Sequence, residues 1–110
     1  MKFDLIELYD IYSDLLTDKQ KMYFEDYYFD NLSLQEISEN YNVSRNAVHN
    51  SLKDTEEKLI YYEEKLKIHY KNNKIKSIVT SINDERIKKE LEELIWKGWK
   101  HVWRNSIHKW

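Results

Sequence analysis

The chain contains no cysteine, no proline and a single glycine, Gly98. Without cysteine there are no disulfides and no thiolate metal sites, and this usage is typical of a reducing compartment such as the cytoplasm. Tight turns of β-sheets usually need glycine or proline, so their scarcity favours helices joined by short polar connections. It also excludes glycine-rich phosphate-binding loops and the glycine-flanked nucleophiles of hydrolases. No apolar run approaches the about 20 residues of a membrane-spanning helix, so we expect a soluble, cytoplasmic protein.

The formal net charge is only −2 at pH 7, but the charges are distributed unevenly along the 110 residues. Residues 1–43 contain ten acidic and three basic side chains, whereas residues 44–110 contain ten acidic and fifteen basic ones. Such an asymmetry suits a protein that approaches a polyanion with one side. A chance imbalance on a solvated surface is the alternative interpretation.

The N-terminal half combines helical spacing of apolar residues with two clear helix starts. Residues 2–16 place one stripe of apolar side chains on a predicted helix, namely Leu5, Leu8, Tyr9, Tyr12 and Leu16. Thr17-Asp-Lys-Gln20 and Ser33-Leu-Gln-Glu36 are capping boxes, in which a hydroxyl and a side chain three residues later bind the exposed backbone N–H groups. They predict a helix from residue 18 to about Phe29, and a short helix that buries Leu34 and Ile37. The first of these helices would bury some of its aromatic side chains, Tyr23, Phe24, Tyr27 and Tyr28.

A third N-cap, Ser44, begins the longest predicted helix, which runs from Arg45 to roughly Tyr70. At 1.5 Å per residue this helix would be about 40 Å long, so its second half extends beyond a three-helix core. Its apolar stripe consists of Val48, Leu52, Leu59, Tyr62 and Leu66. The second half needs a partner, either the isoleucine-rich segment that follows, with a break near Asn83-Asp84, or a second copy of the chain. We expect both, as a homodimer.

The sequence therefore predicts an all-α fold, a helix-turn-helix bundle with a long recognition helix and a C-terminal helical extension. Residues 1–70 would form the helix-turn-helix domain. Residues 71–110 would form a helical segment that packs on the long helix or mediates dimerisation.

Two helices joined by a short turn, the second opened by Ser44, are arranged as a helix-turn-helix requires. Asn40 or Asn42 can take the left-handed conformation that the turn needs. The residues predicted to pack the two helices together are Ile37, Val43, Ala47, Val48 and Leu52. The residues predicted to face outward and to bind nucleic acid are Ser44, Arg45, Asn46, His49, Asn50 and Lys53.

This outward set contains hydrogen-bond donors and amides but no acid. Arginine binds guanine in a bidentate manner and asparagine does the same to adenine, while Ser44 and the helix N-terminus can hold a phosphate. Acids return at Asp54, Glu56 and Glu57, which confines contact to the first two or three turns, as insertion into a major groove predicts. The alternative is a solvated helix face that merely lacks acids, or one that binds protein.

Three segments give the chain a family resemblance, namely Leu16-Thr-Asp-Lys-Gln20, Leu32-Ser-Leu-Gln-Glu-Ile-Ser38 and Val43-Ser-Arg-Asn-Ala-Val48. They resemble the fourth region of sigma-70-type factors, and more closely the YlxM-like family of helix-turn-helix proteins, from about Leu5 to Leu66. The resemblance implies a bacterial, all-helical regulator. Members of this family are typically encoded beside the genes for the signal recognition particle GTPases, which implies a link to that pathway through its RNA or its GTPase.

The C-terminal tail does not belong to this resemblance. All four tryptophans lie there on one helical stripe, Trp96, Trp99, Trp103 and Trp110. Three interpretations stay open: the stripe docks on the long helix or forms a dimer interface, it is a basic aromatic surface for membrane lipid or RNA, or it is an atypical extension.

Nothing in the sequence indicates catalysis. The histidines, which lack metal-ligand spacing, are His49, His69, His101 and His108. The adjacent glutamates at 56–57, 63–64 and 92–93 point to different helix faces, about 100° apart, and are predicted to be solvated charges. We expect no enzyme, no metal and no cofactor.

Two functions remain. The leading interpretation is a DNA-binding or RNA-binding regulator linked to the signal recognition particle pathway. The alternative is a protein-interaction module that binds a component of that particle without sequence-specific DNA binding.

Overall fold

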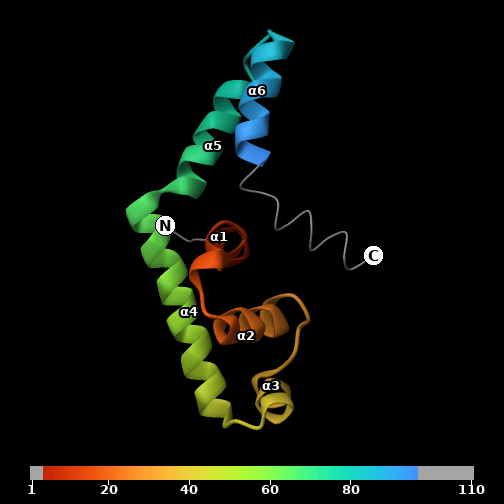
Figure 1. The fold of residues 1–110 in the computed structure, drawn as a ribbon, viewed down its shortest axis with the longest axis vertical. Coiled ribbons are helices and arrows are strands. Elements are labelled where there is room, and N and C mark those ends of the chain that lie inside the picture. The colour runs from red at the N-terminus through yellow and green to blue at the C-terminus, as the bar shows by residue number, and fades with distance from the viewer. Residues whose placement is uncertain (1–3, 97–110) are drawn as a thin grey trace.

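The computed structural model describes residues 4–96, and the regular secondary structure in this range is entirely helical. Its elements in chain order are α1 (Leu5–Tyr12), a 3-10 turn η1 (Ser13–Leu15), α2 (Asp18–Tyr28), α3 (Leu34–Tyr41), α4 (Arg45–Leu66), α5 (Ile68–Val79) and α6 (Glu85–Trp96). Figure 1 shows α1, α2 and α3 stacked along one side of α4, with α5 and α6 beyond the far end of α4. The predicted all-α class is confirmed.

The first four α-helices each begin at a side-chain cap that the local sequence provides. The capping residues are Asp4, Thr17, Ser33 and Ser44. Both predicted capping boxes form, since Gln20 and Glu36 reach back to the backbone N–H of their caps at 3.0 and 3.2 Å. Asn42 caps the C-terminus of α3 with a left-handed φ of 55°, a conformation that costs asparagine less than other β-carbon-bearing residues. Local chemistry therefore sets these boundaries.

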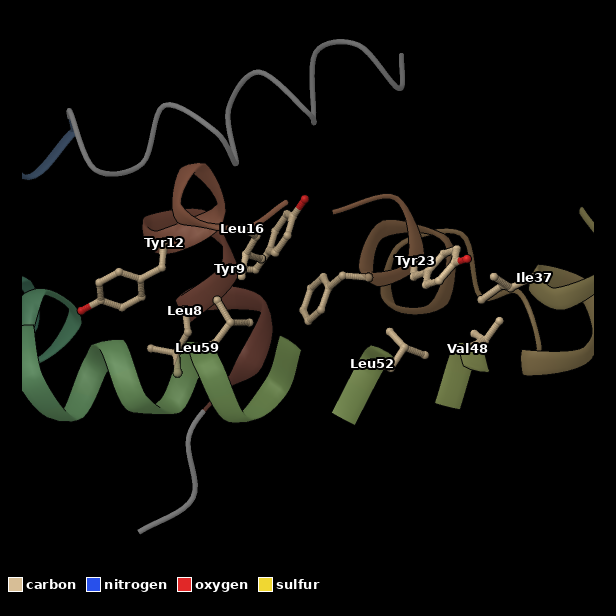
Figure 2. Packing of buried hydrophobic residues seen from close by; sticks show 10 residues of the cluster. Leu8, Tyr9, Tyr12, Leu16, Tyr23, Ile37, Val48, Leu52 and Leu59 are labelled. Carbon is tan, nitrogen blue, oxygen red and sulfur yellow. The ribbon is translucent and has the colours of Figure 1, made fainter. Parts of the chain in front are cut away.

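The core is a layer of apolar and aromatic side chains between α4 and the three helices packed along it (Figure 2). Its buried members are Leu8, Tyr9, Tyr12, Leu16, Tyr23, Phe24, Ile37, Val48, Leu52 and Leu59. In Figure 2, Leu8 and Leu59 point toward each other, as do Ile37 and Val48. These pairs join α1 and α3 to opposite ends of the buried stripe of α4. The predicted apolar stripes of the N-terminal helices are thus the buried faces.

The long helix that the sequence predicted to reach Tyr70 ends at Leu66 instead. Lys67 takes the left-handed conformation, with a φ of 54°, and α5 begins at the next residue. The backbone N–H of Lys67 still donates to the carbonyl of Glu63 at 2.8 Å, but the following N–H groups find other partners. Leu66, predicted to lie on the buried stripe, is the last residue of α4 and is exposed.

Glu63 and Tyr12 supply these partners and fix the start of α5. Its side chain is only 4% exposed, and its carboxylate accepts hydrogen bonds from the Tyr12 hydroxyl at 2.6 Å and from the backbone N–H groups of His69 and Tyr70 at 3.1 and 3.0 Å. The Tyr12 oxygen accepts in turn from the N–H of Ile68 at 3.2 Å. A carboxylate at a helix N-terminus satisfies unpaired N–H groups and interacts favourably with the helix dipole.

This arrangement corrects one prediction and adds a second link between helices. Glu63 is not the solvated charge that the sequence predicted, whereas its neighbour Glu64 is exposed. α5 is also attached to α1, because Nε2 of His69 lies 2.6 Å from a carboxylate oxygen of Glu7. The direction of α5 therefore depends on contacts with both α1 and α4.

α5 and α6 form an antiparallel helical hairpin that extends away from the bundle (Figure 1). Asp84 begins α6, at the predicted break, by accepting hydrogen bonds from the N–H groups of Arg86 and Ile87 at 2.9 and 3.2 Å. α6 packs chiefly against α5, and Val79 and Ile95 are buried.

Among residues 4–96, no helix is both long enough and apolar enough to cross a membrane. The predictions made for Trp99, Trp103 and Trp110 lie outside the described residues, as do those for His101 and His108.

Candidate nucleic-acid interface

The unit formed by α3, its turn and α4 has the connection that a helix-turn-helix requires. Only residues 42–44 separate the two helices, and the backbone N–H of Val43 closes the turn by donating to the carbonyl of Ser38 at 3.0 Å. Ile37 and Val48 are fully buried between the helices. The N-terminal turns of α4 consequently lie at one end of the molecule, remote from α5 and α6 (Figure 1).

All six side chains predicted to face outward are exposed: Ser44, Arg45, Asn46, His49, Asn50 and Lys53. The Ser44 oxygen accepts a hydrogen bond from the backbone N–H of Ala47 at 3.0 Å, so this side chain caps the helix and retains its O–H as a donor. Among residues 4–96, no hydrogen bond or ion pair engages the side chain of Arg45, Asn46, Asn50 or Lys53. These groups are available to an external ligand.

The packing residues of this unit are predicted correctly with one exception. Val48 and Leu52 are buried and Val43 packs partly against the core. Ala47 is exposed, although the sequence predicted that it holds α4 against α3. It lies about 100° around the helix from Val48, whose side chain is fully buried against α3.

Negative charge is absent from the first turn of α4 but returns soon after it. Asp54 and Glu57 are exposed and close the surface that a polyanion could approach. The exposed residues that a polyanion could contact therefore lie within about the first three turns of α4, as the sequence predicts.

A groove of about 380 Å³ runs beside these turns, between α4 and the helices packed on it. It is lined by Tyr27 of α2, Leu34 of α3, and His49, Leu52, Lys53 and Glu56 of α4. Two of the predicted binding residues thus form one wall of the groove. The sequence alone does not predict this groove, because its walls come from three different helices.

Tyr28 fixes the aromatic wall of the groove. Its hydroxyl donates to Glu56, and its ring stacks on Phe24 with centroids 4.3 Å apart. Burial and the bond to Glu56 both raise the pKa of Tyr28, so it stays a neutral donor. Tyr27 lies edge-on to Tyr28, with centroids 5.1 Å apart, and is itself 39% exposed. Glu56, predicted to be a solvated charge, is half-buried and has this structural partner.

A second tyrosine joins α2 to α3. The Tyr41 hydroxyl donates to a carboxylate oxygen of Asp26 at 2.7 Å, and this bond, with burial, raises the pKa of Tyr41 to about 12. Its ring lies 5.3 Å from that of Tyr23. The helix that supports the turn is thereby held in a fixed position relative to α2.

The described residues, 4–96, contain no cluster of three or more histidine, aspartate or glutamate side chains that could hold a metal ion. His49 faces the groove and His69 binds Glu7, so these two histidines have separate surroundings.

Comparison with known proteins identifies the family. Residues 1–97 match the model of the UPF0122 family, described as "Putative helix-turn-helix protein, YlxM / p13 like". The chain belongs to this family. The resemblance inferred from the sequence motifs is therefore confirmed, and the match covers α1 to α6.

Several UPF0122 proteins are similar to the chain over most of its length. One from Mycoplasma capricolum is 41% identical over 103 residues, which are 89% of this chain and 89% of the relative. One from Malacoplasma penetrans is 45% identical over 99 residues, 90% of each chain. One from Listeria monocytogenes is 42% identical over 96 residues, 79% of this chain and 87% of the relative. The similar proteins are bacterial.

Proposed function

We propose that this UPF0122 protein is a regulator that binds nucleic acid through the N-terminal turns of α4. The observation that supports this most directly is an exposed face of α4 with donors and amides but no acid in its first turn. The binding residues would be Ser44, Arg45, Asn46, His49, Asn50 and Lys53. Arginine and asparagine suit the edges of guanine and adenine, and the basic side chains suit phosphate.

The family resemblance supports a cellular context for this activity. Because YlxM-like proteins are typically encoded beside the genes for the signal recognition particle GTPases, we place the protein in the cytoplasm and in that pathway. Its nucleic-acid target would be DNA or the RNA of the particle. A homodimer would present two copies of α4, as helix-turn-helix proteins commonly do.

An alternative function is a protein-interaction module that binds the particle's GTPase. The observation that favours it is the apolar surface of the α5–α6 hairpin, where Ile78 and Leu94 are exposed. Large exposed apolar side chains are typical of protein contacts. In this case the same α4 face would bind protein, and contact of the tryptophan-rich tail with a membrane would be a further, weaker option.

A pull-down from the native bacterium distinguishes the two functions. The tagged protein is captured at moderate salt, the co-purified DNA and RNA are sequenced, and the co-purified proteins are identified. Arg45→Ala should lose the enriched nucleic acid, whereas Arg86→Ala, a matched change on exposed α6, should retain it. Equal enrichment with both variants would contradict the assignment of α4, and recovery of the GTPase without nucleic acid would support the alternative.

A further inference from the structure

The basic side chains of α4 form a row along one wall of the groove. Arg45, His49 and Lys53 are spaced four residues apart, so they follow one another along the same side of the helix. The last two line the groove directly. Positive charge and hydrogen-bond donors are therefore placed along the rim, where a sugar-phosphate chain would pass.

The opposite wall contains an exposed aromatic ring, that of Tyr27. Tyr27 is 39% exposed, and its edge-on contact with Tyr28 restricts its movement. Leu34 and Leu52 add apolar surface between the two walls. A rigid exposed aromatic ring beside basic side chains is the arrangement on which unpaired bases stack.

The carboxylate of Glu56 disfavours a phosphate as the main occupant of the groove. Glu56 lines the groove, and a carboxylate repels a phosphate but accepts hydrogen bonds from the amino and imino groups of bases. One of its oxygens accepts from Tyr28, which leaves the other oxygen for a ligand. The groove thus suits a flat group with an N–H edge attached to an anionic chain.

We propose that this groove binds an unpaired base of a single-stranded nucleic acid, stacked on Tyr27, while Arg45, His49 and Lys53 contact the backbone. The proposal rests on the proposed function, because it uses the same wall of α4. It goes further by naming a bound state, in which at least one base is outside a duplex. A protein that bound only paired DNA through α4 would not need the Tyr27 side of the groove.

The test compares single-stranded and duplex probes by fluorescence anisotropy with the full chain. The probes are a mixed-sequence RNA strand of about 12 nucleotides, a length within ordinary single-strand site sizes, the DNA strand of the same sequence, and the DNA duplex. Tyr27→Leu should weaken single-strand binding about tenfold or more, because one stacking platform is lost, and leave duplex binding within about twofold. Tyr27→Phe should bind like the wild type, since it keeps the ring.

Tyr61→Leu is the matched control, because Tyr61 is an exposed tyrosine of α4 that does not line the groove. Circular dichroism checks that each variant folds. Equal losses for Tyr27→Leu and Tyr61→Leu, a loss with Tyr27→Phe, or no binding of either single strand by the wild type would each overturn the groove proposal. In those cases the proposed function would still be upheld if Arg45→Ala lost duplex binding. The proposed function itself would be overturned if Arg45→Ala bound every probe as the wild type does.

Discussion

Tyrosine hydroxyls donate hydrogen bonds to carboxylates within the helical bundle, both in the acidic segment 1–43 and in α4. The hydrogen-bonded pairs among the described residues are Tyr9–Glu25, Tyr12–Glu63, Tyr28–Glu56 and Tyr41–Asp26. In each pair the carboxylate and burial raise the pKa of the tyrosine, so the phenol remains a donor at neutral pH. These four carboxylates are therefore held by neutral phenol donors.

Asp10 has no such partner, and we predict that it makes stability depend on pH. It is only 7% exposed, and burial, with the charges of Glu7 and Asp4 nearby, raises its pKa to about 7. The unfolded chain loses this proton near pH 4 and the folded chain only near pH 7, so the Asp10 contribution to stability falls as pH rises between these values. As the pH rises from 4 to 8, the free energy of unfolding of Asp10→Asn should therefore increase by about 1 kcal/mol or more relative to that of wild type.

Urea denaturation of both proteins across this pH range measures the difference. Asp54→Asn, an exposed change on α4, serves as the control and should follow the wild-type profile. An Asp10→Asn profile parallel to that of wild type would show that the carboxyl ionises normally in the folded protein.

At the scale of elements, the junction between α4 and α5 depends on one side chain. Removing the Glu63 carboxylate would leave the Tyr12 hydroxyl and two backbone N–H groups without an acceptor. We expect Glu63→Ala to lower the free energy of unfolding by about 2–4 kcal/mol, since several buried donors lose their partner at once. Glu64→Ala, at the exposed neighbouring position, should change it by less than about 0.5 kcal/mol.

Hydrogen exchange separates a local from a general effect of Glu63→Ala. In Glu63→Ala, the exchange rates of the backbone amides of His69 and Tyr70 should rise, relative to wild type, more than those of the amides in α2 and α3. Unchanged protection of these two amides would contradict the capping role.

The sequence predicts those helix boundaries that neighbouring residues determine. The Thr17 and Ser33 capping boxes act within a few residues and form as predicted. Of the two asparagines that the sequence offered for the turn, Asn40 and Asn42, it is Asn42 that is left-handed. The end of α4 at Leu66 could not be predicted in this way. It depends on a bond between Tyr12 and Glu63, which are 51 residues apart in the chain.

The same distinction applies to the candidate interface. Helical geometry alone predicts that Arg45, Asn50 and Lys53 are exposed, and the structure confirms their exposure. It does not predict that Ala47 is exposed, because only the placement of α3 decides which neighbours of Val48 are covered. The groove at Tyr27 was missed for the same reason, since its walls come from three helices.

At the scale of the whole molecule, we predict a homodimer that forms through the α5–α6 hairpin. Leu94 of α6 is 65% exposed, and Ile78 of α5 is also exposed. Pairing of two such faces would bury apolar surface that a monomer leaves in water. Leu94→Glu should shift the protein toward monomer in sedimentation velocity, whereas Leu15→Glu, at an exposed leucine in the η1 turn, should not. A monomeric wild type at high concentration would contradict this prediction.

The most direct test of the central claim, that the N-terminal turns of α4 bind nucleic acid, is the salt dependence of binding. The dissociation constant for the most enriched co-purified nucleic acid is measured over a range of salt concentrations, for wild type and for the double variant Arg45→Ala, Lys53→Ala. Wild-type affinity should fall steeply with salt, and the slope should decrease by about one for each removed cation that contacts a phosphate. A wild-type affinity that barely changes with salt, or equal slopes for the two proteins, would contradict the claim and favour a protein partner.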